Sequence, residues 1–199
     1  MLARAALARA PRGPPRAHGR AVVRFGLLGP LARRAKELGA FLNVDMEDNN
    51  AREATFWLFE QLAETEDLRN WDGLGIVVQA YLNDSLADLE RLLALAKRRG
   101  TPITVRLVKG AYWDTQIKRA QVMGLKTYPV FTRKAGTDLS YLTCAQKLLE
   151  GREYFYPQFA THNAHTMATI MALVGGPDGS FEFQRLHGMG ESLHRLVRE

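Results

Sequence analysis

The chain has 199 residues, of which 46% are hydrophobic and 24% charged, a composition typical of one globular domain rather than of a disordered protein. Its single cysteine excludes an internal disulfide and a thiolate metal cluster. No run of about 18 apolar residues occurs, so we expect no membrane-spanning helix.

The net charge of +6, from 27 basic and 21 acidic side chains, is concentrated at the N-terminal end. Residues 1–36 hold nine basic side chains and no acidic one, which leaves 18 basic against 21 acidic beyond them. Residues 37–199 are therefore mildly acidic, and we expect no nucleic-acid binding from this part of the chain. Residues 1–24, rich in Ala, Arg and Pro, are read as a disordered or wrongly assigned leader, with a transit-like peptide or a basic arm as alternatives. Residues 25–199 form the expected domain.

Helix and strand patterns alternate from the start of this domain. A proline at the front and a glycine at the end predict a helix over residues 30–38. The short apolar run 41–46 predicts the first strand. Asn49 or Asn50 is a suitable cap for the next helix, which carries apolar residues at helical spacing.

The middle of the chain repeats this order. GIVVQAY (75–81) predicts a buried strand. An amphipathic helix follows, with Ser85 as its predicted cap, Leu86 among the side chains that face inward, and Gly100 at its end. The third strand is predicted over residues 103–109.

Two helices are predicted next, over residues 113–123 and 138–149. Strands at 156–161 and 181–186 come after them, and each strand is followed by another helical pattern. The alternation of strands and helices predicts a parallel sheet covered by helices. A barrel and an open doubly wound sheet both fit this order. The absence of a glycine-rich dinucleotide motif and of a P-loop weakens the doubly wound alternative. The predicted fold class is α/β, a partial (β/α)8 TIM-like barrel with about five of eight strands.

Polar side chains follow each predicted strand at its C-terminal end. They are Asp45, Glu47, Gln79, Tyr81, Arg106, Lys109, His162, Asn163, Gln184, His187 and Glu191. The carboxyl ends of parallel strands meet at one edge of the sheet, where ligands bind in this fold class. The pattern therefore predicts a shared ligand site. For any single residue, capping of the following helix or pairing with a neighbour is the alternative.

The densest of these segments is 106–113, RLVKGAYW. Arg106 and Lys109 come from a strand, Gly110 permits close backbone approach, and a helix begins directly after. Cations beside a helix N-terminus suit a phosphate or another anion, and two aromatic residues could stack on a flat ring. A plain strand-to-helix turn with packed aromatics is the alternative.

Three histidines, His162, His165 and His187, together with Asp45, could also suggest a metal-dependent barrel hydrolase. Their spacing alone is weak support, because ligation needs side chains that converge on one point. Neutral histidines that hydrogen-bond a ligand or the backbone are favoured, and no metal ligand is assigned.

Longer motifs carry a family resemblance. RLVKGAYWDTQIKRAQ (106–121), TRKAGTDLSYL (132–142), YPQFATHNAHT (156–166) and FEFQRLHGMGE (181–191) together resemble the proline dehydrogenase domain of bacterial bifunctional proline-utilisation flavoenzymes. NVDMED (43–48) and GIVVQAY (75–81) fit the same domain in the same order. The resemblance covers about residues 25–199.

The resemblance implies a distorted (β/α)8 barrel that binds FAD non-covalently, oxidises L-proline to Δ1-pyrroline-5-carboxylate and passes the electrons to a membrane quinone. It implies catalytic roles for Arg106, Asp45 and Tyr112, and a substrate pocket formed by Asp45, Tyr112 and Leu186. The cofactor contacts that it implies are Gln79, Arg106, Val108, Lys109, Gly110, Ala111, Trp113, Thr132, Lys134, Thr137, His162, Asn163 and Gln184. A cytoplasmic location peripheral to the bacterial inner membrane follows, with a mitochondrial one as the alternative, and the parent protein is expected to be a homo-oligomer.

The sequence also departs from the family pattern. No counterpart appears for the early strands with a glutamate and a substrate-facing lysine, or for the later helix whose arginine pair clamps the proline carboxylate. A bidentate arginine clamp dominates carboxylate recognition. We therefore expect impaired proline oxidation by this segment, with a non-catalytic remnant as the alternative.

Overall fold

The structure is a computed structural model that describes residues 18–176 and 178–198. Its strands are β1 (Leu42–Val44), β2 (Leu74–Gln79), β3 (Ile103–Val108), β4 (Phe155–Ala160) and β5 (Glu182–Gln184). Its helices are α1 (His18–Glu37), α2 (Arg52–Glu64), α3 (Ser85–Arg99), α4 (Trp113–Val122), α5 (Lys134–Glu150), α6 (Ala164–Val174) and α7 (Glu191–Arg198), with a 3-10 turn η1 (Asn49–Ala51) before α2.

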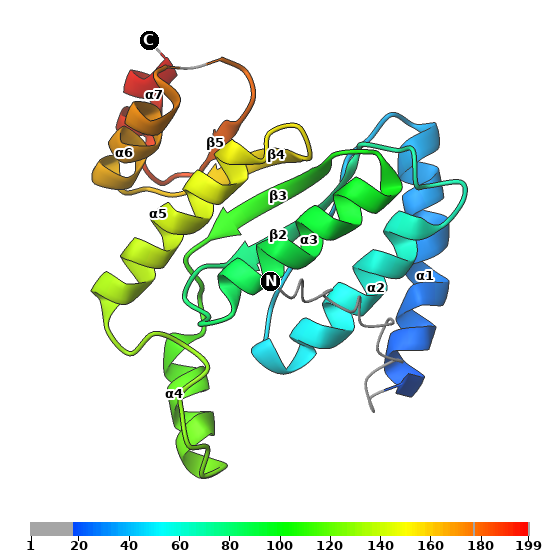
Figure 1. The fold of residues 1–199 in the computed structure, drawn as a ribbon, viewed down its shortest axis with the longest axis horizontal. Helices are drawn as coiled ribbons and strands as arrows, with labels where there is room; N and C mark the ends of the chain where they lie inside the picture. Colours follow the sequence, from blue (N-terminus) through cyan, green and yellow to red (C-terminus); the bar gives the residue numbers. More distant parts are fainter. Residues whose placement is uncertain (1–17, 177, 199) are drawn as a thin grey trace, which may run out of the picture.

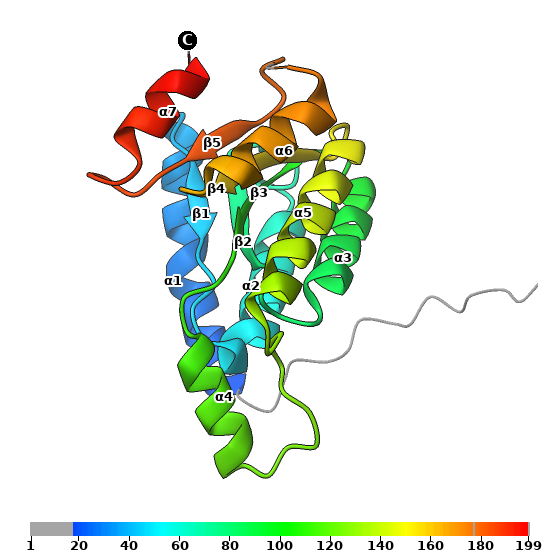
Figure 2. The same cartoon turned by 90° about the vertical axis from the view of Figure 1, so that its left-hand side faces the viewer.

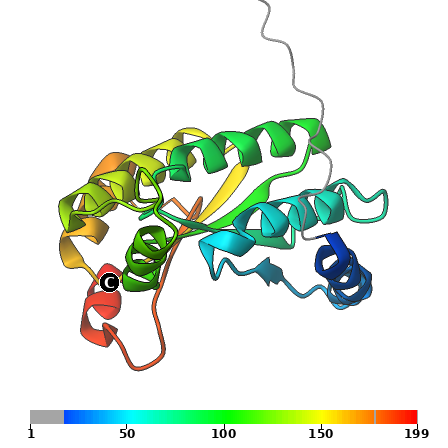
Figure 3. The ribbon, with the colours of Figure 1, turned by 90° about the horizontal axis from the view of Figure 1, so that it is seen from below.

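The described strands form one parallel sheet in the order β1-β2-β3-β4-β5. Strand order thus follows chain order, without the reversal of a doubly wound sheet. The sheet curves like part of a barrel wall, with α2, α3 and α5 on its convex side (Figures 1 and 3). The prediction of a partial TIM-like barrel is confirmed, and the doubly wound alternative is wrong.

The main hydrophobic core lies between the convex side of the sheet and its helices. Alternate strand residues point to this side, among them Ile76, Val105, Leu107 and Phe159, all fully buried. The hydroxyl of Tyr141 on α5 donates to the carbonyl of Leu107 at 3.2 Å, which ties that helix to β3. This packing fixes the strands and so determines where their carboxyl ends lie.

The opposite, concave side carries the other residues of each strand. Register pairs Val77 with Arg106, Arg106 with Gln158, and Gln158 with Glu182. Partners in a parallel sheet share a face, so these side chains all point to the concave side. Figure 2 shows α4 extending beyond the carboxyl ends of the strands, at the end of the sheet opposite to the one where β3 begins.

Several local predictions differ from the structure. Asn49 and Asn50 lie in η1, which Asp48 caps, and Ala51 precedes α2, so neither asparagine caps that helix. Helix α5 begins at Lys134, not at Asp138. The first helix begins at His18, not at Pro30. Pro30 lies inside this helix, and because proline has no backbone N–H, one helical hydrogen bond is missing there. Ser85 does not cap α3, because its hydroxyl is buried against the Ser140 hydroxyl at 3.1 Å. Leu86 is not inward-facing, since 38% of it is exposed.

No helix among the described residues is long and apolar enough to cross a membrane. Residues 1–17, most of the expected leader, lie outside the described residues. The domain boundary at residue 24 stays a prediction.

Candidate functional site

Arg106 is the central polar residue of the concave face. It lies on β3, the middle strand of the sheet, and its guanidinium contacts both edges. Nε donates to Gln184 Oε1 at 2.7 Å, and Nη1 donates to Asp45 Oδ1 at 3.1 Å. Asn43 also donates to the same oxygen of Asp45, at 2.8 Å. The curvature of the sheet therefore brings Asp45 and Gln184, which are far apart in the sequence, to one fixed cation.

Gln79 lies at the end of β2 and is only 3% exposed. Its amide nitrogen donates to the carbonyls of Met46 at 2.9 Å and Glu47 at 3.2 Å, which fastens the segment after β1 to the sheet. Its amide oxygen is buried and has no hydrogen-bond partner among the described residues. A buried acceptor without a donor is costly, so this oxygen is a candidate contact for a ligand N–H.

A pocket of about 370 Å³ opens beside the carboxyl end of β3. It is lined by Tyr81, Lys109, Gly110, Trp113, Thr132, Lys134, Thr137 and Asp138. The residues come from the ends of β2 and β3, the start of α4, and the loop and first turns of α5. Segments that are separate in the sequence thus meet at one concave, partly cationic surface.

A carboxylate organises the two lysines of this pocket. Lys109 Nζ contacts Asp138 Oδ1 and Lys134 Nζ contacts Asp138 Oδ2, each at 2.5 Å. The hydrogen bonds from Lys109 and then Lys134 hold the pKa of Asp138 below its usual value. The cluster therefore keeps one net positive charge, which favours an anionic ligand group.

Gly110 is required at the wall of the pocket. Its φ of +125° lies where residues other than glycine are strained, and a Cβ there would sit 2.4 Å from the Tyr81 ring. The backbone N–H of Tyr81 donates to the carbonyl of Lys109 at 2.7 Å, which holds the two strand ends together. Burial raises the pKa of Tyr81, whose hydroxyl has no partner among the described residues.

The two aromatic residues after Gly110 are partly exposed. Trp113 donates through its indole nitrogen to the carbonyl of Phe131 at 2.8 Å, which connects α4 to the loop before α5. The Tyr112 hydroxyl donates to the Glu47 carboxylate, and this contact raises the pKa of Tyr112. Tyr112 therefore contacts the segment that follows β1, and this segment also contains Asp45.

The end of β4 forms a separate part of the same edge. His162 Nε2 accepts from the backbone N–H of Leu186 at 3.0 Å. Asn163 caps α6, since its side-chain oxygen accepts from the N–H of Thr166 at 2.9 Å. In the part of the chain that is described, no three His, Cys, Asp or Glu side chains could jointly hold a metal. The geometry gives the hydrolase alternative no support.

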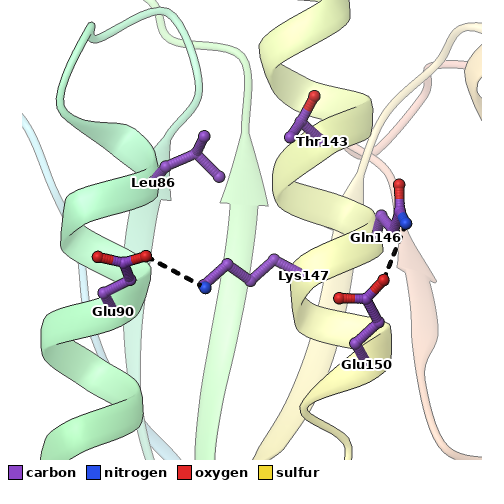
Figure 4. A pocket seen from close by; sticks show the side chains of 6 residues that line it. All are labelled: Leu86, Glu90, Thr143, Gln146, Lys147 and Glu150. Atoms are coloured by element: carbon purple, nitrogen blue, oxygen red, sulfur yellow. Dashed lines mark hydrogen bonds and ion pairs between the residues drawn. The ribbon is translucent and has the colours of Figure 1, made fainter. Parts of the chain in front are cut away.

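A second hollow, of about 270 Å³, lies on the convex side between α3 and α5 (Figure 4). It is lined by Leu86, Glu90, Thr143, Gln146, Lys147 and Glu150. Lys147 pairs with Glu90 at 3.4 Å across it, and Gln146 donates to Glu150 at 2.8 Å. The Lys147–Glu90 pair joins α5 to α3 on the side of the sheet away from Arg106, so this hollow is separate from the site.

The structure gathers the residues named from the sequence in three groups. The concave face holds Asp45, Gln79, Arg106 and Gln184, the pocket holds Lys109, Gly110, Trp113, Thr132, Lys134 and Thr137, and the end of β4 holds His162, Asn163 and Leu186. Val108 ends β3 between the first two groups, and the exposed Ala111 follows it. Leu186 is 65% exposed.

Two residues of the site were missing from the sequence-based assignment. Asp138 is not assigned a role from the sequence, although its spacing of four from Lys134 on a helix predicts an ion pair. Glu182 was not assigned, although its spacing of two from Gln184 on a strand places both on one face. The contact between Lys109 and Asp138 could not be predicted from residue spacing, because the approach of Lys109 to α5 depends on the tertiary fold.

The comparisons with known proteins point to one family. The proline dehydrogenase family model matches residues 4–199. The chain is 47% identical over 172 residues to the bifunctional protein PutA of Escherichia coli K12, covering 85% of this chain and 13% of that protein. It is 30% identical over 167 residues to the proline dehydrogenase of Deinococcus radiodurans, covering 82% of this chain and 47% of that protein.

Solved structures give the same result. The crystal structure of Bradyrhizobium japonicum proline utilization A (mutant D778Y) superposes with a TM-score of 0.86 at 47% identity, over 89% of this chain and 18% of that one. A proline utilization A from Bdellovibrio bacteriovorus has the same TM-score at 39% identity. The chain thus spans less than a fifth of the bifunctional proteins that it matches. With a family model that covers nearly all of its residues, the chain belongs to the proline dehydrogenase family.

Proposed function

We propose that this chain forms part of a proline dehydrogenase that binds FAD and oxidises L-proline to Δ1-pyrroline-5-carboxylate. The observation that carries the proposal is the position of Arg106. A cation on the middle strand, fixed by Asp45 and Gln184, faces the concave side of a barrel wall, beside a pocket with two lysines. Family membership supplies the reaction, and this geometry supplies a location for it.

The residues present fit FAD. The cofactor has a flat ring, a polyhydroxylated linker and an anionic pyrophosphate. The orphaned oxygen of Gln79 offers an acceptor for a ring N–H. Lys109, Lys134 and the glycine-lined wall at Gly110 suit the pyrophosphate and linker, since a side chain at Gly110 would meet Tyr81. Bound FAD supplies the acceptor for the hydride that proline loses, which explains why no protein nucleophile is needed.

Each residue then has a defined task. Arg106 supplies a fixed positive charge where negative charge develops as the acceptor is reduced, and preorganised charge of this kind is a large term in catalysis. Asp45 and Gln184 hold its guanidinium in place. Lys109 and Lys134 bind the anionic part, and their contacts with Asp138 keep them ordered before binding.

On the substrate side, we assign Asp45, Tyr112 and Leu186 to the proline pocket. Tyr112 and Leu186 are both exposed, at 40% and 65%, at the carboxyl edge of the sheet. Tyr112 is anchored through Glu47, and the N–H of Leu186 is anchored through His162. Both side chains could therefore cover a small amphipathic substrate that lies over Arg106.

The wider assignments remain parts of this proposal. Electrons pass from the reduced cofactor to a membrane quinone, and the parent protein is a homo-oligomer, peripheral to the inner membrane on the cytoplasmic side. The resemblance to bifunctional membrane-linked enzymes supports these assignments. The expected impairment of proline oxidation stays a prediction.

The test is to measure flavin binding and proline-dependent reduction separately. The protein is loaded with FAD, its visible spectrum is recorded, and bleaching by L-proline is followed without oxygen. Arg106→Met should lower the rate of bleaching by about 100-fold, the usual effect of one preorganised donor, while FAD affinity falls by far less. Equal losses of both, or a wild-type protein that binds no FAD, would contradict the proposal.

A further inference from the structure

The concave face carries a chain of hydrogen bonds that begins at Arg106. Arg106 Nε donates to Gln184 Oε1 at 2.7 Å, and Gln184 Nε2 donates to Glu182 Oε1 at 2.6 Å. The other carboxylate oxygen of Glu182 accepts from the Tyr156 hydroxyl at 3.4 Å. All four side chains come from β3, β4 and β5, and all are partly buried. The chain thus runs from the proposed flavin contact to the edge of the described sheet.

The geometry of this chain follows from strand register. Gln158 on β4 pairs with Arg106 on one side and with Glu182 on the other, so all three lie on the concave face. Gln184 lies two residues after Glu182 and shares this face. The intervening Phe183 turns the other way and packs against Phe159, with ring centroids 6.1 Å apart. This packing fixes β5 and keeps Glu182 and Gln184 side by side.

The direction of the hydrogen bonds is determined by chemistry. An ionised carboxylate can only accept, and an arginine can only donate, whereas an amide has one end of each kind. Glu182 therefore selects the rotamer in which the nitrogen of Gln184 faces Glu182 and the oxygen faces Arg106. In the reversed rotamer, the amide nitrogen would face Arg106 Nε, and two donors would oppose each other.

We propose that Glu182 is a positioning residue that acts through the Gln184 amide to hold the Arg106 guanidinium. With Nε held by Gln184 and Nη1 by Asp45, the guanidinium is fixed from both edges of the sheet. Its second terminal nitrogen, Nη2, makes no hydrogen bond to the described residues, so both of its N–H groups remain for a ligand. The effect of Glu182 on FAD binding rests on the proposed function, whereas its effect on the position of the Arg106 guanidinium does not.

Two readouts on the full chain test this assignment. The first is the ¹⁵N–¹H NMR signal of Arg106 Nε in the protein without flavin, identified by its loss in Arg106→Met. The second is the dissociation constant for FAD, obtained by fluorescence titration. Glu182→Ala should broaden or shift the Nε signal and weaken FAD binding by about tenfold, the effect of one charge-assisted hydrogen bond. Glu182→Gln keeps an acceptor and should stay closer to the wild type in both measurements.

The decisive variant is Glu182→Ala combined with Gln184→Glu. Both oxygens of a carboxylate accept, so residue 184 would then face Arg106 correctly in either rotamer, and the net charge is unchanged. This double variant should recover the protected Nε signal that Glu182→Ala loses. It also tests the proposal if Glu182→Ala alone does not fold.

Glu150→Ala is the matched control, because it removes a similar hydrogen bond from a glutamine, Gln146, on the convex side (Figure 4). It should leave both readouts unchanged. The proposal is overturned if Glu182→Ala matches this control, or if the double variant is no better than Glu182→Ala. If the wild type binds no FAD, the proposed function fails, and the NMR comparison still decides the role of Glu182.

Discussion

At the scale of single residues, the site depends on groups whose environment leaves them few alternatives. Gly110 occupies a backbone conformation that other residues avoid, directly against the Tyr81 ring. Asp138 is shared by two lysines, and Arg106 is shared by two edge strands. Such constraints are typical of sites that are preorganised before a ligand arrives.

The first prediction concerns Gly110. Gly110→Ala should reduce FAD affinity at least tenfold, because the new Cβ must displace the Tyr81 ring that lines the pocket. Gly100→Ala is the control, since Gly100 also has a positive φ, of +69°, but nothing lies within 4 Å of the added atom. Titration with FAD, together with thermal unfolding, separates the two effects. Equal FAD affinity in both variants would contradict the placement of the pocket.

The second prediction concerns the pH dependence that Asp138 creates. Its pKa is lowered in the folded protein by its lysine contacts, so the folded state favours the charged form. This stabilisation is present above the ordinary pKa of 3.8 that the Asp138 carboxyl has in the unfolded chain, and it is lost as pH falls through the lower folded pKa.

Asp138→Asn should therefore be less stable than the wild type at pH 5 to 8, by less than about 1 kcal/mol because the pair is partly exposed. The difference should shrink in acid below about pH 4. Urea unfolding at a series of pH values measures it. A difference that grows toward acid pH would have the wrong sign for this account.

At the scale of elements, the sequence predicts most of what the chain forms locally. The five strands were located to within a few residues because each is an apolar run between turn signals. The starts of α1 and α5 were placed too late, at Pro30 and Asp138, because proline and acidic residues are also common at true helix starts. Ser85 looked like a cap because the sequence cannot show Ser140, 55 residues away, which its hydroxyl contacts instead.

A third prediction belongs to α3. The buried Arg99 at its end donates to three backbone carbonyls of the loop between α2 and β2, those of Leu68, Arg69 and Trp71, at 3.2, 3.0 and 2.6 Å. Arg99→Leu should lower the free energy of unfolding by about 3 kcal/mol, since it leaves carbonyls without a donor. The neighbouring Arg98, which pairs with Glu64 at the surface, serves as the control, and Arg98→Ala should cost less than about 1 kcal/mol. Chemical denaturation compares the two, and similar losses would show that Arg99 does not anchor this loop.

At the scale of the whole molecule, the strand order explains why a site exists at all. Parallel strands that follow chain order place all their carboxyl ends at one edge and curve the sheet around its concave face. This arrangement could be predicted from the alternation of elements and the polar residues at the strand ends. The contacts from Arg106 to Asp45 and Gln184, 61 and 78 residues away, depend on that curvature, which no local pattern encodes.

The central claim is that the concave face at Arg106 and the pocket at Lys109 together hold one FAD molecule. A crystal structure of the protein with FAD tests this most directly. The account predicts the isoalloxazine ring over the concave face, with Arg106 Nη2 about 3 Å from a ring atom, and the pyrophosphate beside Lys109 and Lys134. FAD bound elsewhere, such as between α3 and α5, or bound with Arg106 turned away from the ring, would contradict it.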